Sequence, residues 1–271
     1  DHLLVEQSSD GIIQLSDGCL CCTVRGELVD TLADLVDRLQ TGRIEKLARV
    51  VIETTGLADP APVLQSIMAH PALVQAFRLD GVVTLVDAVN GDATLTAHVE
   101  ALKQVAMADR LVLAKSDLAD AGQIAALTMR LKEINPGATL LPVQEADAAA
   151  LLDCGLYNPA TKSADVARWL GEAAQDDHHH DHDGHGHDHH HEHDHDHHHA
   201  HRHDSRVKTF SLVHDGPVAF AAIDMFFDLL RSTHGEQLLR MKGVIELKED
   251  PARPLVVHGV QKLLHPPARL P

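Results

Sequence analysis

The chain has 271 residues, 44% of them hydrophobic and only 3% aromatic, which is enough for one large or two modest domains with an aliphatic core. Its formal net charge of −17 disfavours nucleic acid and anionic membranes as partners, because both require a basic face, and no apolar run approaches the roughly 20 residues that span a bilayer. Four cysteines, three of them clustered, make no disulfide framework for a chain this long and favour a reducing, cytoplasmic compartment.

Residues 1–174 alternate short apolar runs with amphipathic helical stretches. The runs expected to be strands are "GIIQLS" (11–16), "ARVVIE" (48–53), "GVVTLVD" (81–87), "RLVLAKSD" (110–117) and "ATLLPVQ" (138–144). After the first run, apolar residues at helical spacing predict a helix with its buried face at Leu28, Leu32, Leu35, Val36 and Leu39. Apolar runs without alternation, separated by helices, indicate an α/β fold with a mostly parallel sheet covered on both faces.

Polar side chains stand at the ends of several of these runs, at Glu53, Asp87, Lys115 and Asp117. In open α/β sheets, ligands bind in the crevice outside the carboxyl ends of the strands. The sequence therefore predicts a ligand site formed by these residues.

Three of the four cysteines lie in the stretch "GCLCC", as Cys19, Cys21 and Cys22. Thiolates this close together suit Zn(II), Co(II) or Cu(I), and three of them leave one position of a tetrahedral ion open. Such a site fits a metal that is passed on better than a metal locked in a structural role. Two other interpretations stay open: the cysteines pack as small hydrophobes, or they form a redox switch.

Two strand ends carry patterns that nucleotide hydrolases use. In "VVIETTGLADP", a carboxylate at the place of Glu53 can hold Mg²⁺ through water, and the amide of Gly56 can meet a γ-phosphate. In "LVLAKSD", Asp117 can accept hydrogen bonds from the edge of guanine while the stem of Lys115 covers the base. An ordinary strand–turn–helix connection and a solvated strand end explain the two patterns equally well when each is taken alone.

The remaining chain falls into two parts. Residues 175–205 hold sixteen histidines between His178 and His203, interleaved with acids, and we interpret them as a disordered linker with metal affinity. Residues 206–271 predict a small α+β domain. Its expected elements are a strand at "VKTFSLV" (207–213), a helix over 218–232 with Ile223, Phe226, Phe227 and Leu230 inward, and a β-pair at "VIELK" (244–248) and "LVVHGVQ" (255–261).

Together, "LSDGCLCCTVRGEL" (15–28), "VIETTGLADP" (51–60), "AKSD" (114–117), the histidine-rich linker and the small C-terminal domain resemble the CobW-type P-loop GTPases, a family of metallochaperones. The resemblance implies a GTPase domain over 1–174, a linker over 175–205 and a CobW C-terminal domain over 206–271. It implies that the full-length parent hydrolyses GTP with Mg(II), and that Zn(II), or Co(II), is transferred from the cysteines to a client metalloenzyme.

Residue by residue, the resemblance makes Cys19, Cys21 and Cys22 the metal ligands. It makes Glu53 the catalytic acid near Mg²⁺ and the γ-phosphate. Gly56 then contacts the nucleotide, and Lys115 with Asp117 reads guanine.

The sequence departs from the family in three places. It contains no G-x-x-x-x-G-K-[ST] motif, so we expect that these 271 residues by themselves do not hydrolyse GTP at a useful rate. Without the strand that precedes such a motif, apolar sheet edges should be exposed. Ala114 replaces the usual Asn or Thr and loses a bracing hydrogen bond, and the family's C-terminal domain continues past the position of Pro271.

Two rival functions remain at this point. The first is a cobalt delivery factor for cobalamin synthesis. The second is a metal buffer with no nucleotide role, which the missing motif favours, whereas "ETTG" and "KSD" favour a GTPase. A non-functional truncated product is the third and least informative alternative.

Overall fold

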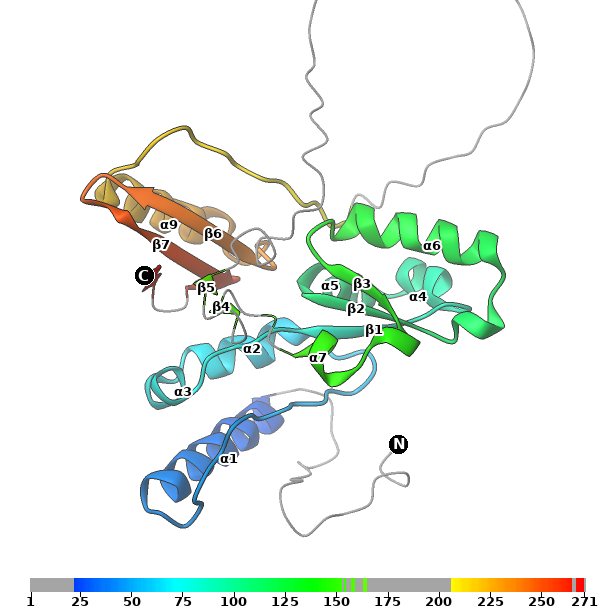
Figure 1. The fold of residues 1–271 in the computed structure, drawn as a ribbon, viewed down its shortest axis with the longest axis horizontal. Coiled ribbons are helices and arrows are strands. Elements are labelled where there is room, and N and C mark those ends of the chain that lie inside the picture. The colour runs from blue at the N-terminus through cyan, green and yellow to red at the C-terminus, as the bar shows by residue number, and fades with distance from the viewer. Residues whose placement is uncertain are drawn as a thin grey trace, which may run out of the picture.

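The computed structural model describes residues 22–152, 154, 157–158, 163–164, 206–264 and 267–270. Figure 1 shows two parts, an α/β unit built on a parallel sheet and a smaller unit in which one helix lies against an antiparallel sheet. The predicted α/β class is therefore confirmed. Within the described ranges, no helix is both long enough and apolar enough to cross a membrane.

The parallel sheet is formed by β1 (Val83–Asp87), β2 (Arg110–Ala114) and β3 (Thr139–Pro142), in that order. Three of the predicted apolar runs are thus strands, as expected. The register places Asp87, the last residue of β1, opposite Ala114, the last residue of β2. Because the strands are parallel, their carboxyl ends meet at one edge of the sheet.

Helices connect the strands and cover the sheet (Figure 1). They are α4 (Gly91–Ala97) and α5 (Val99–Met107) between β1 and β2, and η2 (Ser116–Leu118) and α6 (Ala121–Ile134) between β2 and β3. Leu102, Leu111 and Leu131 are fully buried in the cluster that α5, β2 and α6 share. This cluster fixes the strand ends by packing them between helices.

The first described helix, α1 (Cys22–Gln40), confirms the helix predicted from apolar spacing. Its residues Leu28, Leu32 and Val36 are buried against α2 (Pro60–Met68) and α3 (Pro71–Ala76), whereas Leu39 is exposed. The predicted strand over 11–16 lies outside the described residues.

The predicted strand over 48–53 is wrong. These residues have irregular backbone, and the side chain of Val51 is 79% exposed. The physical reason is that a strand forms only by pairing, and residues 48–53 pair with none of the described strands. Burial alternates along β1, so that Thr84 and Val86 are buried while Val83 and Leu85, on the other face of the strand, are 38% and 70% exposed.

After β3 the chain forms η3 (Val143–Glu145), α7 (Ala148–Leu151) and a short antiparallel pair, β4 (Tyr157–Asn158) with β5 (Ser163–Ala164). The predicted linker over 175–205 lies outside the described residues. The next described segment begins at Arg206, which donates to the carbonyl oxygen of Leu95 (2.8 Å) near the end of α4. Thr209 donates to Ile134 (2.9 Å) at the end of α6, so this segment is anchored on the α/β unit.

The smaller unit packs α9 (Phe220–His234) on an antiparallel sheet. The sheet consists of β6 (Met241–Leu247), β7 (Asp250–Val260), β8 (Leu263–Leu264) and β9 (Ala268–Arg269). The predicted helix and β-pair are confirmed. Phe227, Leu247, Leu255 and Val257 make the core between helix and sheet.

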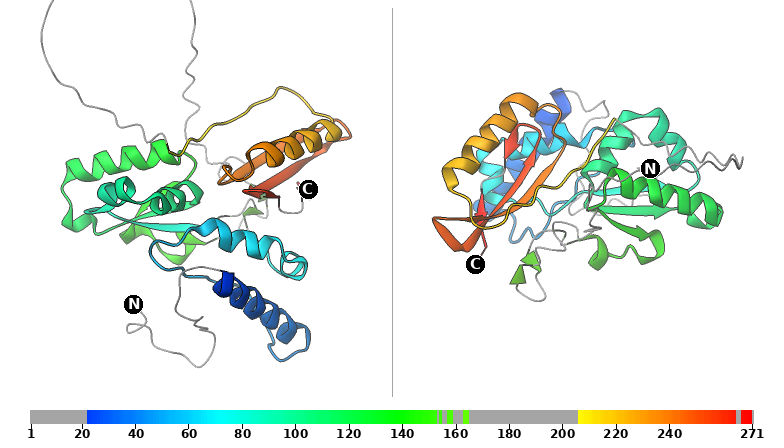
Figure 2. Two further views of the ribbon diagram at one scale, coloured as in Figure 1. Left: turned by 180° about the vertical axis from the view of Figure 1, so that it is seen from behind. Right: turned by 90° about the horizontal axis from the view of Figure 1, so that it is seen from above.

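Two expectations for this unit are wrong. Residues 207–213 form no strand, and Phe210 and Leu212 are 71% and 75% exposed, because Thr209 is held on α6 and leads the chain away from the sheet (Figure 2). Phe226 is 40% exposed, whereas its neighbour Phe227 is buried. Adjacent helical residues point about 100° apart, so only one of the two phenylalanines can face β6 and β7.

The two units contact each other through α2, α5 and β7. Ala61, Leu64 and Met68 of α2 pack with Met107 and Val260 in one buried cluster. The side chain of Gln65 also donates a hydrogen bond to that of Gln261.

Candidate functional site

The carboxyl ends of β1 and β2 bring together two residues that the sequence places 28 positions apart. The Nζ atom of Lys115 donates to Oδ2 of Asp87 over 2.7 Å. The hydrogen bonding continues one residue past the end of β1, since the amide of Ala88 donates to the carbonyl oxygen of Ala114 (2.9 Å), the last residue of β2. The predicted meeting of strand-end polar residues is therefore seen for this pair.

A tight turn after β1 holds the Asp87 carboxylate. Its Oδ1 accepts from the backbone amides of Val89 (2.8 Å) and Asn90 (3.0 Å), and its Oδ2 accepts from the Asn90 side chain (3.2 Å). The hydrogen bond from Lys115, followed by the bond from the Asn90 amide, holds the pKa of Asp87 well below its usual value of 3.8, although burial acts in the opposite direction. The group is therefore a fixed anion at neutral pH.

Lys115 itself has a left-handed backbone, with φ 57° and ψ 29°. Such a conformation is costly for a residue with a Cβ and is common at functional sites. The amide of Leu118 donates to the Lys115 carbonyl (3.1 Å), which closes η2 and leaves Asp117 exposed. Asp117 is therefore an exposed acid at the carboxyl end of β2, and its role toward guanine stays a prediction.

The segment that carries Glu53 and Gly56 is held at its C-terminal end by contacts with α5. Gln104 of α5 donates to the carbonyl oxygens of Gly56 (3.0 Å) and Ala58 (2.9 Å). Asp59 caps α2 and pairs with Lys103 (2.6 Å). Glu53 precedes this anchored portion and is exposed, so the structure fixes Gly56 against α5 and leaves the Glu53 side chain in solvent.

Gly56 needs no special conformation here. It has no positive φ, and a Cβ at this position would meet nothing within 4 Å. Close approach of a ligand to its backbone remains a reason for glycine at this place.

Of the three clustered cysteines, Cys19 and Cys21 lie outside the described residues, and Cys22 begins α1. Within the part of the chain that is described, no three His, Cys, Asp or Glu side chains form a group that could hold a metal. The fourth cysteine, Cys154, is buried, and burial raises the pKa of its thiol above the ordinary value. The metal site at Cys19, Cys21 and Cys22 stays a prediction.

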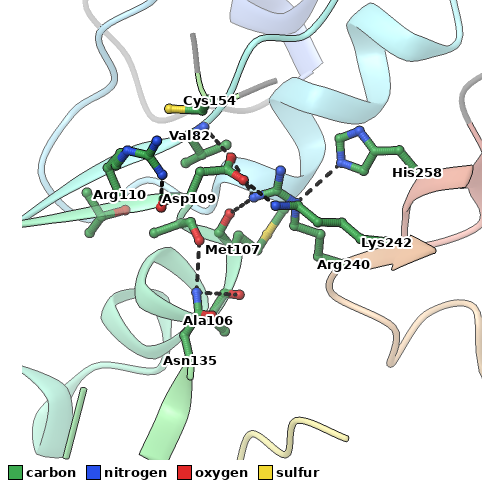
Figure 3. Close-up of polar contacts among 12 residues, drawn as sticks. Val82, Ala106, Met107, Asp109, Arg110, Asn135, Cys154, Arg240, Lys242 and His258 are labelled. Carbon is green, nitrogen blue, oxygen red and sulfur yellow. Dashed lines mark hydrogen bonds and ion pairs between the residues drawn. The ribbon is translucent and has the colours of Figure 1, made fainter. Parts of the chain in front are cut away.

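A second polar cluster, which sequence reasoning missed, lies at the amino end of β2 (Figure 3). The side chain of Asp109 is only 2% exposed. Its carboxylate forms ion pairs with Lys242 of β6 and with Arg240, which lies directly before β6. Lys242 lies 2.7 Å from Oδ1, Arg240 lies 2.8 Å from Oδ2, and the Val82 amide also donates to Oδ2 (2.8 Å). We call these three charged residues the junction cluster, because they join the two units.

The charges of the junction cluster depend on one another. Burial by itself would raise the pKa of Asp109, but the charges of Arg240 and Lys242 outweigh it and hold that pKa below 3.8. Burial lowers the pKa of Lys242 below its ordinary 10.5, although Asp109 opposes this. Arg240 further donates to the carbonyl oxygen of Met107 and to Nε2 of His258 (3.3 Å), so the cluster is hydrogen-bonded on several sides.

The sequence held one signal for this cluster. Asp109 directly precedes β2 and Arg110 is its first residue, ahead of four apolar residues, a place where charges are buried only when paired. Arg110 is hydrogen-bonded within the α/β unit, since it donates to the carbonyl oxygen of Ala150 (3.1 Å) and to the hydroxyl of Thr139 (3.1 Å). The partners of Asp109 are 131 and 133 positions away, which sequence spacing does not reveal.

Comparison with known proteins gives matches over both units. The CobW/HypB/UreG nucleotide-binding domain matches residues 1–142, and the cobalamin synthesis protein cobW C-terminal domain matches residues 207–271. The zinc chaperone YjiA of Escherichia coli (strain K12) is 31% identical over 266 residues, which cover 97% of this chain and 74% of YjiA. The zinc-regulated GTPase metalloprotein activator 1 of Schizosaccharomyces pombe is 32% identical over 149 residues, 54% of this chain and 35% of that protein.

Among solved structures, a crystal structure of the Zn(II)-bound YjiA GTPase from E. coli aligns with a TM-score of 0.57 and 27% identity. The alignment covers 89% of this chain and 66% of that one. The chain thus spans about three quarters of YjiA and about a third to a half of the other curated relatives it matches. Since one family domain matches over half of the chain and a relative aligns along nearly all of it, the chain belongs to the CobW/HypB/UreG nucleotide-binding family and carries a CobW C-terminal domain.

Proposed function

We propose that this protein is a GTP-dependent metallochaperone that binds Zn(II) through Cys19, Cys21 and Cys22 and transfers it to a client metalloenzyme. The observation that carries the proposal is the alignment of nearly the whole chain with a zinc chaperone, together with three cysteines clustered in one short stretch. Zn(II) is favoured over Co(II) because the relatives are named for zinc and one was crystallised with it.

The donor set suits a metal that must leave again. Three thiolates bind Zn(II) tightly, and the fourth tetrahedral position remains for water or for a ligand of the client. Cys22 occupies the first residue of α1, where the amino end of the helix dipole favours negative charge. The sixteen histidines of residues 178–203 add weak sites on the same polypeptide and raise the local metal concentration.

The nucleotide would be held at the carboxyl ends of the strands. In this assignment Glu53 acts as the catalytic acid near Mg(II) and the γ-phosphate, and the Gly56 amide approaches that phosphate. Lys115 covers the face of guanine and Asp117 accepts hydrogen bonds from its edge. The exposed Glu53 side chain and the exposed η2 turn leave room for such a ligand.

Hydrolysis would be coupled to metal release through the segment that precedes α1. GTP orders switch segments of GTPases through its γ-phosphate and Mg²⁺, and hydrolysis releases them. Cys19 and Cys21 precede α1 and Cys22 is its first residue, so ordering of that segment would bring three thiolates onto one ion. Its release weakens the site and favours transfer to the client.

A metal titration of the full-length protein tests the proposal. Co(II), followed by competition with Zn(II), is added with and without GTP and Mg(II), and the Co–thiolate charge-transfer absorption is recorded. We expect one thiolate site per chain, tightened by GTP, that disappears in Cys21→Ser and survives in the matched control Cys154→Ala. Tight one-to-one binding in Cys21→Ser would refute the ligand assignment, and a site indifferent to GTP would indicate a metal buffer.

A further inference from the structure

The contact between Asp87 and Lys115 joins a rigid carboxylate to a residue in a costly conformation. Asp87 is fixed by two backbone amides and the Asn90 side chain, so its oxygens cannot follow a moving partner. Lys115 has a left-handed backbone conformation. Residues other than glycine adopt this conformation only when surrounding contacts hold them in it. The ion pair is one of the contacts that hold it.

The residue before Lys115 is Ala114, which has no polar side chain that could help to hold the conformation of Lys115. Ala114 contributes only its carbonyl oxygen, which accepts from the amide of Ala88. The turn after β2 is therefore braced from β1, through the backbone bond of Ala88 and the side-chain bond of Asp87. Both bonds follow from the parallel register that sets Asp87 opposite Ala114.

We propose that Asp87 is a positioning residue for the nucleotide base: by binding the ammonium of Lys115 it aims the four-carbon stem of that lysine across the base that Asp117 reads. This inference rests on the proposed function. Asp87 itself touches no ligand in this arrangement. It acts by restricting the rotamers of Lys115, which otherwise loses side-chain freedom when a base docks on its stem.

Lys115 and Asp117 would contact different parts of the base, so their loss should affect guanosine and inosine nucleotides differently. A lysine stem covers any purine face, whereas the Asp117 carboxylate distinguishes guanine, with its exocyclic amino group, from hypoxanthine, which lacks it. Loss of Asp87 should therefore weaken guanosine and inosine nucleotides by the same factor. Loss of Asp117 should weaken the guanosine nucleotide more than the inosine nucleotide.

The test measures binding of GDP, IDP and ADP to the full-length protein and to Asp87→Asn, Lys115→Gln, the double variant and Asp117→Asn. Asp92→Asn is the matched control, because Asp92 lies in the first turn of α4, five residues after Asp87, and pairs with a different cation, Arg130 (2.6 Å). Asp87 and Lys115 are partly exposed, so we expect Asp87→Asn to weaken GDP and IDP about two- to fivefold each, with the loss shrinking at high salt. The double variant should bind no worse than Lys115→Gln, because both changes remove the same interaction.

Two results would overturn the inference while leaving the proposed function intact. In the first, the wild type prefers GDP to ADP and Asp87→Asn binds GDP and IDP as tightly as wild type does. In the second, the losses of the two single variants multiply in the double variant. A wild-type protein with no preference for GDP over ADP would instead overturn the proposed function, and this inference with it.

Discussion

Replacing Asp109 by Asn removes the negative charge at the centre of the junction cluster and keeps the shape of the side chain. The carboxylate is 2% exposed and faces two cations, Arg240 and Lys242, which are 10% and 18% exposed. The variant leaves both cations with no counter-charge from this residue. We expect the two units to separate more easily as a result.

The magnitude follows from burial. Removing one partner of a buried ion pair costs about 3–5 kcal/mol, because the charge that stays behind has lost its compensation. Replacing Lys242 by Met should cost much less, about 1 kcal/mol, since Arg240 still neutralises Asp109 and the burial that lowers the pKa of Lys242 already works against its charge. The exposed pair of Asp228 with Arg231 gives a matched control, and Asp228→Asn should cost less than about 1 kcal/mol.

Urea unfolding followed by circular dichroism measures these free energies, and amide hydrogen exchange shows where protection is lost. The pKa of Asp109 lies below 3.8 in the folded protein, so its contribution is present above that value and is lost as the pH falls through the folded pKa. The stabilities of wild type and Asp109→Asn should therefore differ at pH 7 and converge at strongly acidic pH. A loss under 1 kcal/mol at pH 7, or a larger loss in Lys242→Met than in Asp109→Asn, would refute the reasoning.

Three further predictions concern other groups of the α/β unit. Asn135→Ala should destabilise the protein by about 2–3 kcal/mol in urea unfolding, because its side-chain amide donates to the carbonyls of Val105 (2.8 Å) and Ala108 (2.9 Å) at the end of α5; an unchanged midpoint would contradict this. Asp120→Ala should cost about 1 kcal/mol through loss of the capping box of α6, and Asp120→Asn, as its control, should cost less. Cys154 should react with a thiol reagent at neutral pH only after unfolding, because it is buried and its pKa is raised; rapid labelling of this residue in the native protein, mapped by mass spectrometry, would show that the burial is wrong.

The strands that were predicted correctly from the sequence are those that pair with another described strand. The apolar runs at β1, β2 and β3 lie side by side in parallel, so the pattern and the structure agree. The runs over 48–53 and 207–213 have equally suitable composition. They are irregular because a strand forms only by pairing, and composition does not show which edge is available.

The candidate site could be predicted in outline and not in its contacts. Position at a strand end identified Asp87, Lys115 and Asp117 from sequence, since parallel strands bring such ends together. The bond between Asp87 and Lys115 depends on the register of β1 against β2, and the burial of Asp109 depends on docking of the smaller unit. Both are products of tertiary packing, which leaves no periodic trace in the sequence.

Strand β2 sets a fixed distance between the junction cluster and the turn at Lys115. Its amino end begins next to Asp109 and its carboxyl end leads into Lys115, about 20 Å away at the usual rise of an extended chain. Arg110 through Leu113 are all buried and the strand is hydrogen-bonded on both sides, so it cannot shorten or bend without breaking the sheet. The strand therefore links the junction cluster to the turn at Lys115 as one continuous, fully paired segment.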